Sequence, residues 1–250
     1  MKEFNYKDAG KTIGWSFSKM NYTAECPSGF DYYKTVTTHI TPKTVMLDIG
    51  SGSGEKSIRY YSFAKKIYIT DFEEEMLKKA KQNINKYYGT SPRVKSKFNT
   101  KTLDCNGPFD FADSTFDLVV SRHCGANMNE VFRVLKKDGV FVSEDVSADD
   151  CQEIKELFGR GQNFNEEPLY KTVLKECVDA GFDEIKLIRF DEIEYYKTAD
   201  DLNFLLSNTP ILGGFDEEND VALLNKYIES HTTKKGIRLN RKLYAFILKK

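Results

Sequence analysis

The five cysteines of the sequence include no pair spaced as C-x-x-C. Their number is odd and they are scattered along the chain, so the sequence predicts neither a disulfide framework nor a zinc site. We expect reduced thiols, a cytoplasmic location and no bound metal.

Long apolar runs are missing as well. No segment approaches the roughly 20 consecutive apolar residues that a membrane-spanning helix needs. The N-terminal residues 1–8 lack the apolar core of a signal peptide. The sequence therefore predicts a soluble, intracellular protein with no membrane partner.

Neither sign of charge is in excess, because 37 basic residues stand against 38 acidic ones and the net charge is −1. A chain with no overall positive field is a poor candidate for binding nucleic acid through phosphate neutralisation, although a local basic patch is still compatible with this balance. With 250 residues, 40% of them hydrophobic, the chain is long enough for one sizeable domain.

The most informative stretch is 44–54, where three apolar residues lead to Asp48 and then to three glycines at alternate positions. This pattern predicts a buried strand running into a tight turn, because backbone that contacts a ligand or takes positive φ tolerates no Cβ. A dinucleotide site would carry a glycine where this chain has Glu55. A nicotinamide-dependent oxidoreductase is therefore disfavoured.

Strand-like and helix-like segments alternate from Val45 to Val146, which predicts a parallel sheet with right-handed crossovers. A continuously apolar segment near the C-terminus suits a further buried strand. The expected strands are 45–48, 66–71, 93–99, 114–123, 139–146, 183–195 and 242–248. The expected helices are 30–40, 55–63, 72–88, 127–137, 148–160, 169–180, 199–207 and 216–230.

The glycine spacing, with Asp48 two residues ahead of it, resembles the cofactor loop of class I S-adenosylmethionine-dependent methyltransferases. The resemblance extends to Asp104, an acid thirteen residues before Asp117, and to the helix-turn-strand segment 133–141. It covers 44–139 well. It does not reach residues 1–43 or the insertion at 197–235.

This resemblance implies an α/β fold that is doubly wound. Its mostly parallel seven-stranded sheet would carry helices on both faces and an antiparallel last strand. The family-like domain is expected over 44–250. We expect residues 1–43 and a helical insertion at 197–235 to form a cap over the substrate, because segments outside the strand ends are where specificity tends to reside.

The resemblance also implies S-adenosylmethionine as cofactor and S-adenosylhomocysteine as product. Asp71 ends the second expected strand, 21 residues beyond Gly50, where a carboxylate can accept both ribose hydroxyls. Asp104 matches the acid that accepts the adenine amino group, although a surface-turn aspartate is the alternative. The other residues predicted to bind the cofactor are Asp48, Gly50, Ser51, Gly52, Gly54, Phe72, Cys105 and Ser121.

Candidates for the acceptor side follow the fourth and fifth strands, because ligands of open α/β sheets bind outside the carboxyl ends of the strands. His123 is the candidate catalytic base, since its ordinary pKa suits proton abstraction near neutral pH, or it only shapes the pocket. Arg122 either binds an anionic substrate group or pairs with an acid such as Glu144. Trp15 and Tyr22 either cover a sheet edge or close over the substrate as a lid.

Several features of the sequence limit the classes of molecule that could accept the methyl group. The segment 121–125 reads Ser-Arg-His-Cys-Gly, not the Asn-Pro-Pro-Tyr or Asp-Pro-Pro-Tyr of methylases that act on amino groups of nucleic acids. Cys124 is not preceded by the proline of cytosine-5 methyltransferases and is predicted to be a small buried thiol. The basic residues of 234–242 could form a phosphate-binding stripe, but we expect them to form the solvated edge of the last strand, because the rest of the chain supplies no matching positive field.

These observations predict methyl transfer to a small-molecule acceptor by in-line displacement, with most of the catalysis coming from positioning. One alternative is an RNA or protein methyltransferase built on the same core. Another is a protein that binds the cofactor without transferring its methyl group.

Overall fold

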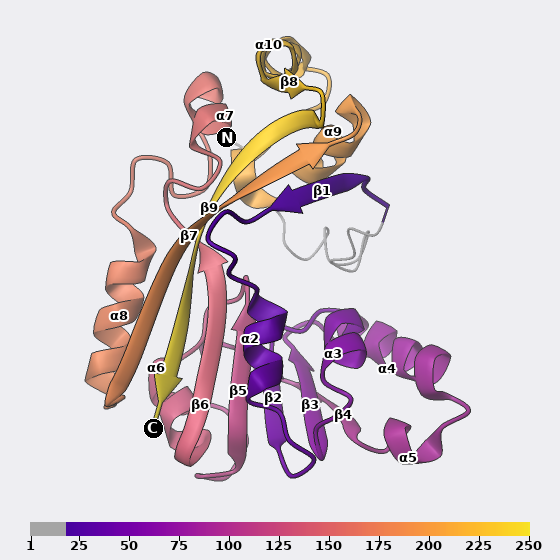
Figure 1. Cartoon of the computed structure of the whole chain (residues 1–250), viewed down its shortest axis with the longest axis vertical. Coiled ribbons are helices and arrows are strands. Elements are labelled where there is room, and N and C mark those ends of the chain that lie inside the picture. The colour runs from indigo at the N-terminus through magenta and orange to yellow at the C-terminus, as the bar shows by residue number, and fades with distance from the viewer. Residues whose placement is uncertain (1–18) are drawn as a thin grey trace. The chain divides into compact units, whose positions relative to one another are not determined.

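The computed structural model describes residues 19–250, which fall into two compact units (Figure 1). We call the first of them the larger unit. It consists of Asp31–Asp145, Lys171–Ile188 and Tyr244–Lys250. The smaller unit consists of Val146–Tyr170, Arg189–Leu243 and the described part of the N-terminal segment.

The larger unit is organised on seven strands, three of which also contribute residues to the smaller unit. Their order in the sheet is β7-β9-β6-β5-β2-β3-β4. The strands are β2 (Val45–Ile49), β3 (Lys66–Asp71), β4 (Phe98–Thr102), β5 (Phe116–Arg122), β6 (Leu135–Val146), β7 (Glu184–Tyr196) and β9 (Gly236–Lys249). The pairings among β2 to β6 are parallel, and Figure 1 shows β9 running opposite to its neighbours. The predicted mostly parallel sheet with an antiparallel last strand is confirmed, but two further short strands, described below, extend the expected seven strands to nine.

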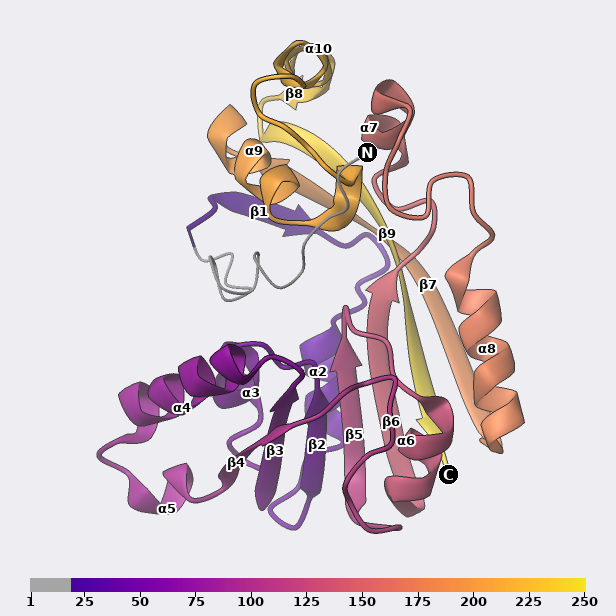
Figure 2. The same ribbon diagram turned by 180° about the vertical axis from the view of Figure 1, so that it is seen from behind.

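Strand β2 lies at the centre of the parallel part, and Met46, Leu47 and Ile49 are fully buried. Such a near-continuous apolar run is typical of a parallel strand that is covered on both faces. Helix α2 (Tyr32–Thr38) covers the face turned to the viewer in Figure 1, and α6 (Met128–Val134) covers the opposite face, seen in Figure 2. Because β2 pairs parallel with both β3 and β5, the carboxyl ends of these three strands meet at the same end of the sheet.

Four further helices belong to the larger unit. They are α3 (Glu55–Tyr60), α4 (Glu74–Tyr88), α5 (Pro92–Lys95) and α8 (Leu169–Ala180). Helix α4 packs against α3, β3 and β4 through a stripe of buried residues, Met76, Ala80 and Ile84, at intervals of four. The helix expected over 72–88 is therefore present, although it begins only at Glu74.

The smaller unit combines the remaining parts of β7 and β9 with short elements. These are β1 (Tyr22–Glu25), α7 (Gln152–Phe158), α9 (Ala199–Ser207), the 3₁₀-helix η1 (Pro210–Leu212), α10 (Val221–His231) and β8 (Thr232–Thr233). Strand β1 pairs antiparallel with β7, with Tyr22 opposite Tyr196, and β8 pairs antiparallel with β9. The sequence did not predict β1 or β8, because both are short and exposed and lack apolar alternation.

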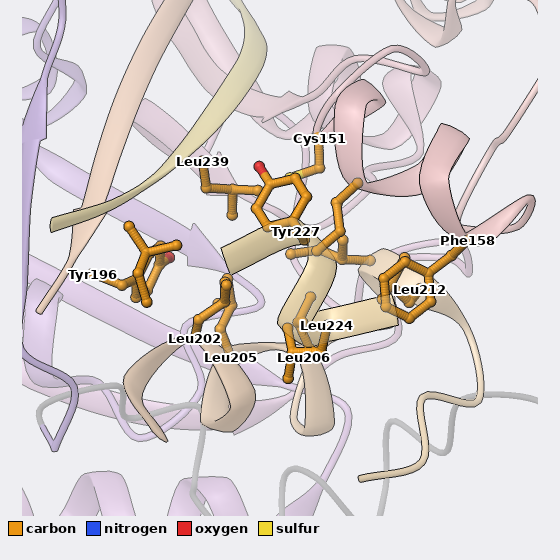
Figure 3. Close-up of a cluster of buried hydrophobic side chains, with 13 residues drawn as sticks. Cys151, Phe158, Tyr196, Leu202, Leu205, Leu206, Leu212, Leu224, Tyr227 and Leu239 are labelled. Carbon is orange, nitrogen blue, oxygen red and sulfur yellow. The ribbon is translucent and has the colours of Figure 1, made fainter. Parts of the chain in front are cut away.

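Buried apolar side chains give the smaller unit a hydrophobic core of its own (Figure 3). The core residues come from α7, α9, η1, α10, β7 and β9 and the residue preceding α7. They are Cys151, Ile154, Phe158, Tyr196, Leu202, Leu205, Leu206, Ile211, Leu212, Leu224, Tyr227, Ile237 and Leu239. The helices of 197–235 are thus held by hydrophobic packing. Their role as a substrate cap stays a proposal.

Two expectations about local structure were wrong. Residues 93–99 were predicted as a strand, but α5 occupies Pro92–Lys95 and β4 begins only at Phe98. Proline is favoured in the first turn of a helix, and that local preference outweighs the apolar alternation of the segment. The basic run 234–242 was predicted to be solvated throughout, yet the Arg241 side chain is only 13% exposed.

Candidate cofactor site

The loop between β2 and α3 contains the three glycines that the sequence singled out. Gly50, Gly52 and Gly54 all have left-handed backbone, with φ of 66°, 56° and 71°. A Cβ on Gly50 would lie 2.5 Å from the Sγ atom of Cys124, and one on Gly54 would lie 3.0 Å from Ile69 Cδ1. Glycine is therefore required here by both conformation and space.

Hydrogen bonds tie this glycine loop to the ends of β2 and β3. The Ser51 amide donates to the Thr70 carbonyl at 2.8 Å, and the Ser51 hydroxyl donates to the Asp48 carbonyl at 2.8 Å. The Gly52 amide donates to Asp71 Oδ2 at 2.9 Å. Two predicted cofactor residues, Gly52 and Asp71, are thus brought into direct contact.

Asp71 is the last residue of β3, and each oxygen of its carboxylate accepts a hydrogen bond from a backbone amide. Its Oδ1 atom accepts the Glu73 amide at 2.9 Å, and its Oδ2 atom accepts the Gly52 amide. Burial raises the pKa of Asp71, and these two backbone donors oppose the rise. Because each carboxylate oxygen has a second lone pair, both can still accept a ligand hydroxyl.

Phe72 and Asp104 are both exposed to solvent. The Phe72 ring, next to Asp71, is 66% exposed, which is unusual for a large apolar side chain and suits contact with a flat apolar ligand. The Asp104 Oδ1 atom accepts the Asn106 amide at 2.9 Å, so half of its carboxylate supports a local turn. The adenine role of Asp104 and its surface-turn alternative both remain open.

Ser121 lies near the end of β5, whereas Cys105 lies in the loop that follows β4. Ser121 is buried at the end of β5, where its hydroxyl donates to the Cys124 carbonyl and its own carbonyl accepts the Tyr32 hydroxyl at 3.1 Å. Ser121 therefore shapes the loop that follows β5. The thiols of Cys105 and Cys124 are only partly buried, so the prediction of a buried Cys124 was wrong.

Asp48 lies beneath the glycine loop with only 8% of its surface exposed. Its Oδ2 atom accepts the Ser57 hydroxyl, and Ser57 belongs to α3. Burial raises the pKa of Asp48 to about 7, although the hydrogen bonds with Ser57 and Ser51 oppose the rise. The carboxyl group is therefore partly protonated near neutral pH.

We expect Asp48 to make the protein less stable as the pH rises. Its pKa in the folded state is about 7, above the roughly 3.9 of an unfolded chain, so stability is fully present below about pH 4 and is lost as the pH rises through 7. Relative to Asp48→Asn, the wild type should lose up to about 4 kcal/mol across this interval. Urea denaturation of both proteins at several pH values measures the difference.

A matched control is Glu74→Gln, which changes an exposed acid of α4. Its stability relative to the wild type should vary with pH by less than about 0.5 kcal/mol. A stability difference between wild type and Asp48→Asn that is constant from pH 4 to 8 would contradict the expectation.

Arg122 and Glu144 pair at the carboxyl ends of β5 and β6. The distance from Arg122 Nε to Glu144 Oε1 is 2.7 Å, and the Glu144 side chain is only 6% exposed. The guanidinium also lies 5.6 Å from the centre of the Tyr33 ring. Of the two roles considered for Arg122, pairing with an acid is confirmed, while contact with a substrate stays a proposal.

His123 follows β5 with a left-handed backbone, φ 53°, which is uncommon for a residue other than glycine. Its amide donates to the Glu144 carbonyl at 2.8 Å, and its Nε2 atom lies 3.8 Å from Glu144 Oε1. The imidazole is 38% exposed. The His123 ring thus lies near a buried carboxylate and is reachable from solvent.

Sequence reasoning missed the tyrosines of α2 and α3. The Tyr33 ring stacks on Tyr60 with ring centres 4.4 Å apart, and the Lys56 ammonium lies 5.6 Å from the Tyr33 ring. No local pattern signals this cluster, because its members come from two helices separated by a strand. It places cations and aromatic rings beside Arg122.

Two further residues, Trp15 and Tyr22, were predicted to form a lid. Trp15 lies outside the described residues. Tyr22 belongs to the smaller unit, where its ring is 41% exposed and stacks on Tyr196 at 5.5 Å. The lid function of both stays a prediction.

The described residues include neither a candidate membrane helix nor a candidate metal cluster. Within 19–250, no helix is both long and apolar enough to cross a membrane. In the same part of the chain, no three or more His, Cys, Asp or Glu side chains are grouped so that they could hold a metal ion.

Comparison with known proteins gives one family match. A family model described as a methyltransferase domain matches residues 40–200, which include the glycine loop, the three acids Asp48, Asp71 and Asp104, and the residues Arg122 and His123. No curated protein matches the chain.

Solved structures share the fold at low sequence identity. The YcgJ protein from Bacillus subtilis has a TM-score of 0.60 at 16% identity, with 87% of this chain and 95% of that one covered. A functionally unknown protein from Deinococcus radiodurans R1 has a TM-score of 0.58 at 16% identity, with 97% and 96% covered. Phosphoethanolamine N-methyltransferase 2 from Haemonchus contortus, solved with S-adenosyl-L-methionine, has a TM-score of 0.55 at 13% identity, with 99% and 60% covered.

Proposed function

Since this chain belongs to the class I S-adenosylmethionine-dependent methyltransferase family, we propose that it transfers the cofactor's methyl group to a small-molecule acceptor. The observation that supports this most directly is the glycine loop, whose Gly52 amide is held by the carboxylate of Asp71. The loop and the acid at the end of the next strand are the two parts of a nucleoside site in such folds.

The described residues fit this cofactor. The glycines of the loop leave room for a ligand against the backbone. Asp71 retains an acceptor position on each oxygen for the two ribose hydroxyls. The exposed ring of Phe72 provides an apolar surface for the adenine, and Asp104 is our candidate for its amino group.

When bound, S-adenosylmethionine supplies an electrophilic methyl group, so the protein has to position the acceptor and remove its proton. We assign removal of this proton to His123, whose Nε2 atom lies 3.8 Å from Glu144 Oε1. Arg122 is neutralised by the same carboxylate at 2.7 Å and is proposed to position the acceptor through its remaining guanidinium N–H groups.

A small acceptor is supported by two features. The chain carries a net charge of −1, which provides no overall field for a nucleic acid. At the ends of β5 and β6, Arg122 Nε and His123 Nε2 lie 2.7 Å and 3.8 Å from Glu144 Oε1, as convergent polar groups do in sites for small ligands. RNA or protein acceptors and a non-catalytic binding protein remain as the alternatives.

Calorimetric titration with S-adenosylmethionine and S-adenosylhomocysteine tests the cofactor site, with NADH as the control ligand. We expect Asp71→Ala to bind both adenosyl ligands about 100-fold more weakly, since hydrogen bonds to a charged group contribute about 1.5–3 kcal/mol each. Asp110→Ala, which removes an acid that is 95% exposed, should bind as the wild type does. A folded wild-type protein that binds neither adenosyl ligand would remove the basis of the proposal.

Transfer of a labelled methyl group to small molecules, RNA and protein extracts then tests the acceptor. With the best acceptor, His123→Gln should lower kcat by about 100-fold without changing cofactor affinity, because general base catalysis contributes factors of that order. Transfer to RNA or protein alone would favour the first alternative. Tight cofactor binding without transfer to any class would favour the second.

A further inference from the structure

Two loops of the larger unit meet beside the glycine loop. One follows β4 and carries Cys105, and the other follows β5 and carries Cys124. The Asn127 amide donates to the Cys105 carbonyl at 2.8 Å, and a Cβ on Gly125 would lie 3.7 Å from Asn106 Oδ1. The two loops are therefore in contact through backbone as well as side chains.

This contact brings two thiols together. Cys105 and Cys124 belong to these two contacting loops, their side chains are close enough to influence one another, and both residues are partly exposed. The other three cysteines differ, since Cys151 and Cys177 are buried and the Cys26 thiol contacts the Ser28 hydroxyl at 3.2 Å. A reagent from solvent can thus reach a pair of thiols at one place.

The same pair touches the cofactor loop. The Cys124 Sγ atom occupies the position next to Gly50 Cα, 2.5 Å from where a Cβ would stand. Its position is set by the loop backbone, since the Ser121 hydroxyl donates to the Cys124 carbonyl. Any change at Cys124 is therefore transmitted to Gly50 by direct contact.

We propose that Cys105 and Cys124 are a modification site, at which a peroxide forms a reversible disulfide that weakens cofactor binding. The second part rests on the proposed function, because it requires the glycine loop to bind S-adenosylmethionine.

The chemistry needs one equivalent of hydrogen peroxide. The neighbouring Cys124 side chain lowers the pKa of Cys105, and the neighbouring Cys105 side chain raises the pKa of Cys124, so Cys105 is the thiolate that attacks. Its sulfur bonds to one peroxide oxygen as the O–O bond breaks, which forms a sulfenic acid, and the departing hydroxide is protonated to water. The Cys124 thiol then attacks the sulfenic sulfur, loses its proton and releases a second water. The two thiols supply the two electrons that reduce the peroxide.

The disulfide changes the geometry at the glycine loop. A disulfide holds its sulfur atoms at about 2.05 Å, closer than two separate thiols can approach, so Cys124 Sγ has to move relative to Gly50. The bond also fixes the loops after β4 and β5 to one another. We expect the oxidised protein to bind S-adenosylmethionine at least about 10-fold more weakly, and a thiol reductant to restore the affinity.

Mass spectrometry locates the bond. The protein is treated with hydrogen peroxide, free thiols are blocked, and the chain is digested with trypsin. Cleavage after Arg122 separates 102–122, which contains Cys105, from 123–133, which contains Cys124. The expected product is these two peptides joined, with the loss of two hydrogens and separation by reductant. Calorimetry on the same samples measures the affinity for S-adenosylmethionine.

Cys105→Ser and Cys124→Ser should each abolish the linked peptides, whereas Cys26→Ser should leave them unchanged. Linkage to another cysteine, or oxidation of Cys105 without linkage, would overturn the site. Linked protein that binds S-adenosylmethionine as tightly as reduced protein would overturn the effect on binding. The mass measurement needs no cofactor, so reduced protein that fails to bind S-adenosylmethionine counts against the proposed function and not against the disulfide.

Discussion

Replacing Arg241 by methionine is expected to destabilise the protein by about 3–5 kcal/mol, because two buried carboxylates lose the guanidinium that is hydrogen-bonded to both of them. Arg241 Nε lies 2.9 Å from Asp150 Oδ1, and its Nη1 lies 3.1 Å from Glu194 Oε1. The side chains of these two acids are only 3% and 8% exposed. Urea denaturation of Arg241→Met at pH 7 measures the loss.

Arg238 on the same strand provides the matched control. Its pair with Glu153 is longer, 3.3 Å, and both side chains are about 40% exposed, so Arg238→Met should cost less than about 1 kcal/mol. Adding Asp150→Asn and Glu194→Gln to Arg241→Met should recover part of the loss, since the two buried negative charges are then removed. Equal losses for the two arginine variants would contradict the buried ion pairs.

Gly50→Ala is expected to cost about 2–4 kcal/mol of stability and at least about 100-fold in affinity for S-adenosylmethionine. Left-handed backbone is unfavourable for alanine, and the added methyl would meet Cys124 Sγ at 2.5 Å and Cys124 Cβ at 2.6 Å, which adds the cost of overpacking. Relief of that contact has to displace the glycine loop or the loop after β5. Thermal denaturation and calorimetric titration measure the two losses.

The variant Gly159→Ala separates the cost of left-handed backbone from the cost of the clash with Cys124. Its φ is 64°, and a Cβ there would meet nothing within 4 Å, so Gly159→Ala reports the backbone cost alone, about 1–2 kcal/mol. Combining Gly50→Ala with Cys124→Gly removes the clash and should recover part of the lost stability and affinity. A Gly50→Ala protein as stable as Gly159→Ala would show that the contact with Cys124 is not rigid.

Local patterns were most reliable where a single element decides its own conformation. Strand β3 begins and ends at the predicted residues, Lys66 and Asp71. Helix α9 also has the predicted bounds, and its start is explained by a capping box between Thr198 and Asp201. Amphipathic spacing and caps act over three or four residues, so they can be read without knowing the fold.

The sequence was less informative where partners are distant along the chain. Strand β1 exists because its backbone pairs with β7, and its four exposed residues carry no pattern of their own. The stacking of Tyr33 on Tyr60 also depends on how two helices are packed. Such contacts are absent from any local window of sequence.

The sequence by itself determined the parallel α/β alternation, the glycine loop and the acids Asp48 and Asp71 at the strand ends, because these depend on spacing within short segments. Tertiary structure alone decided that Arg241 is buried between two carboxylates and that the Cys124 side chain packs against Gly50. The reason is that spacing along a chain sets backbone conformation, whereas burial and side-chain contact depend on which elements the crossovers bring together.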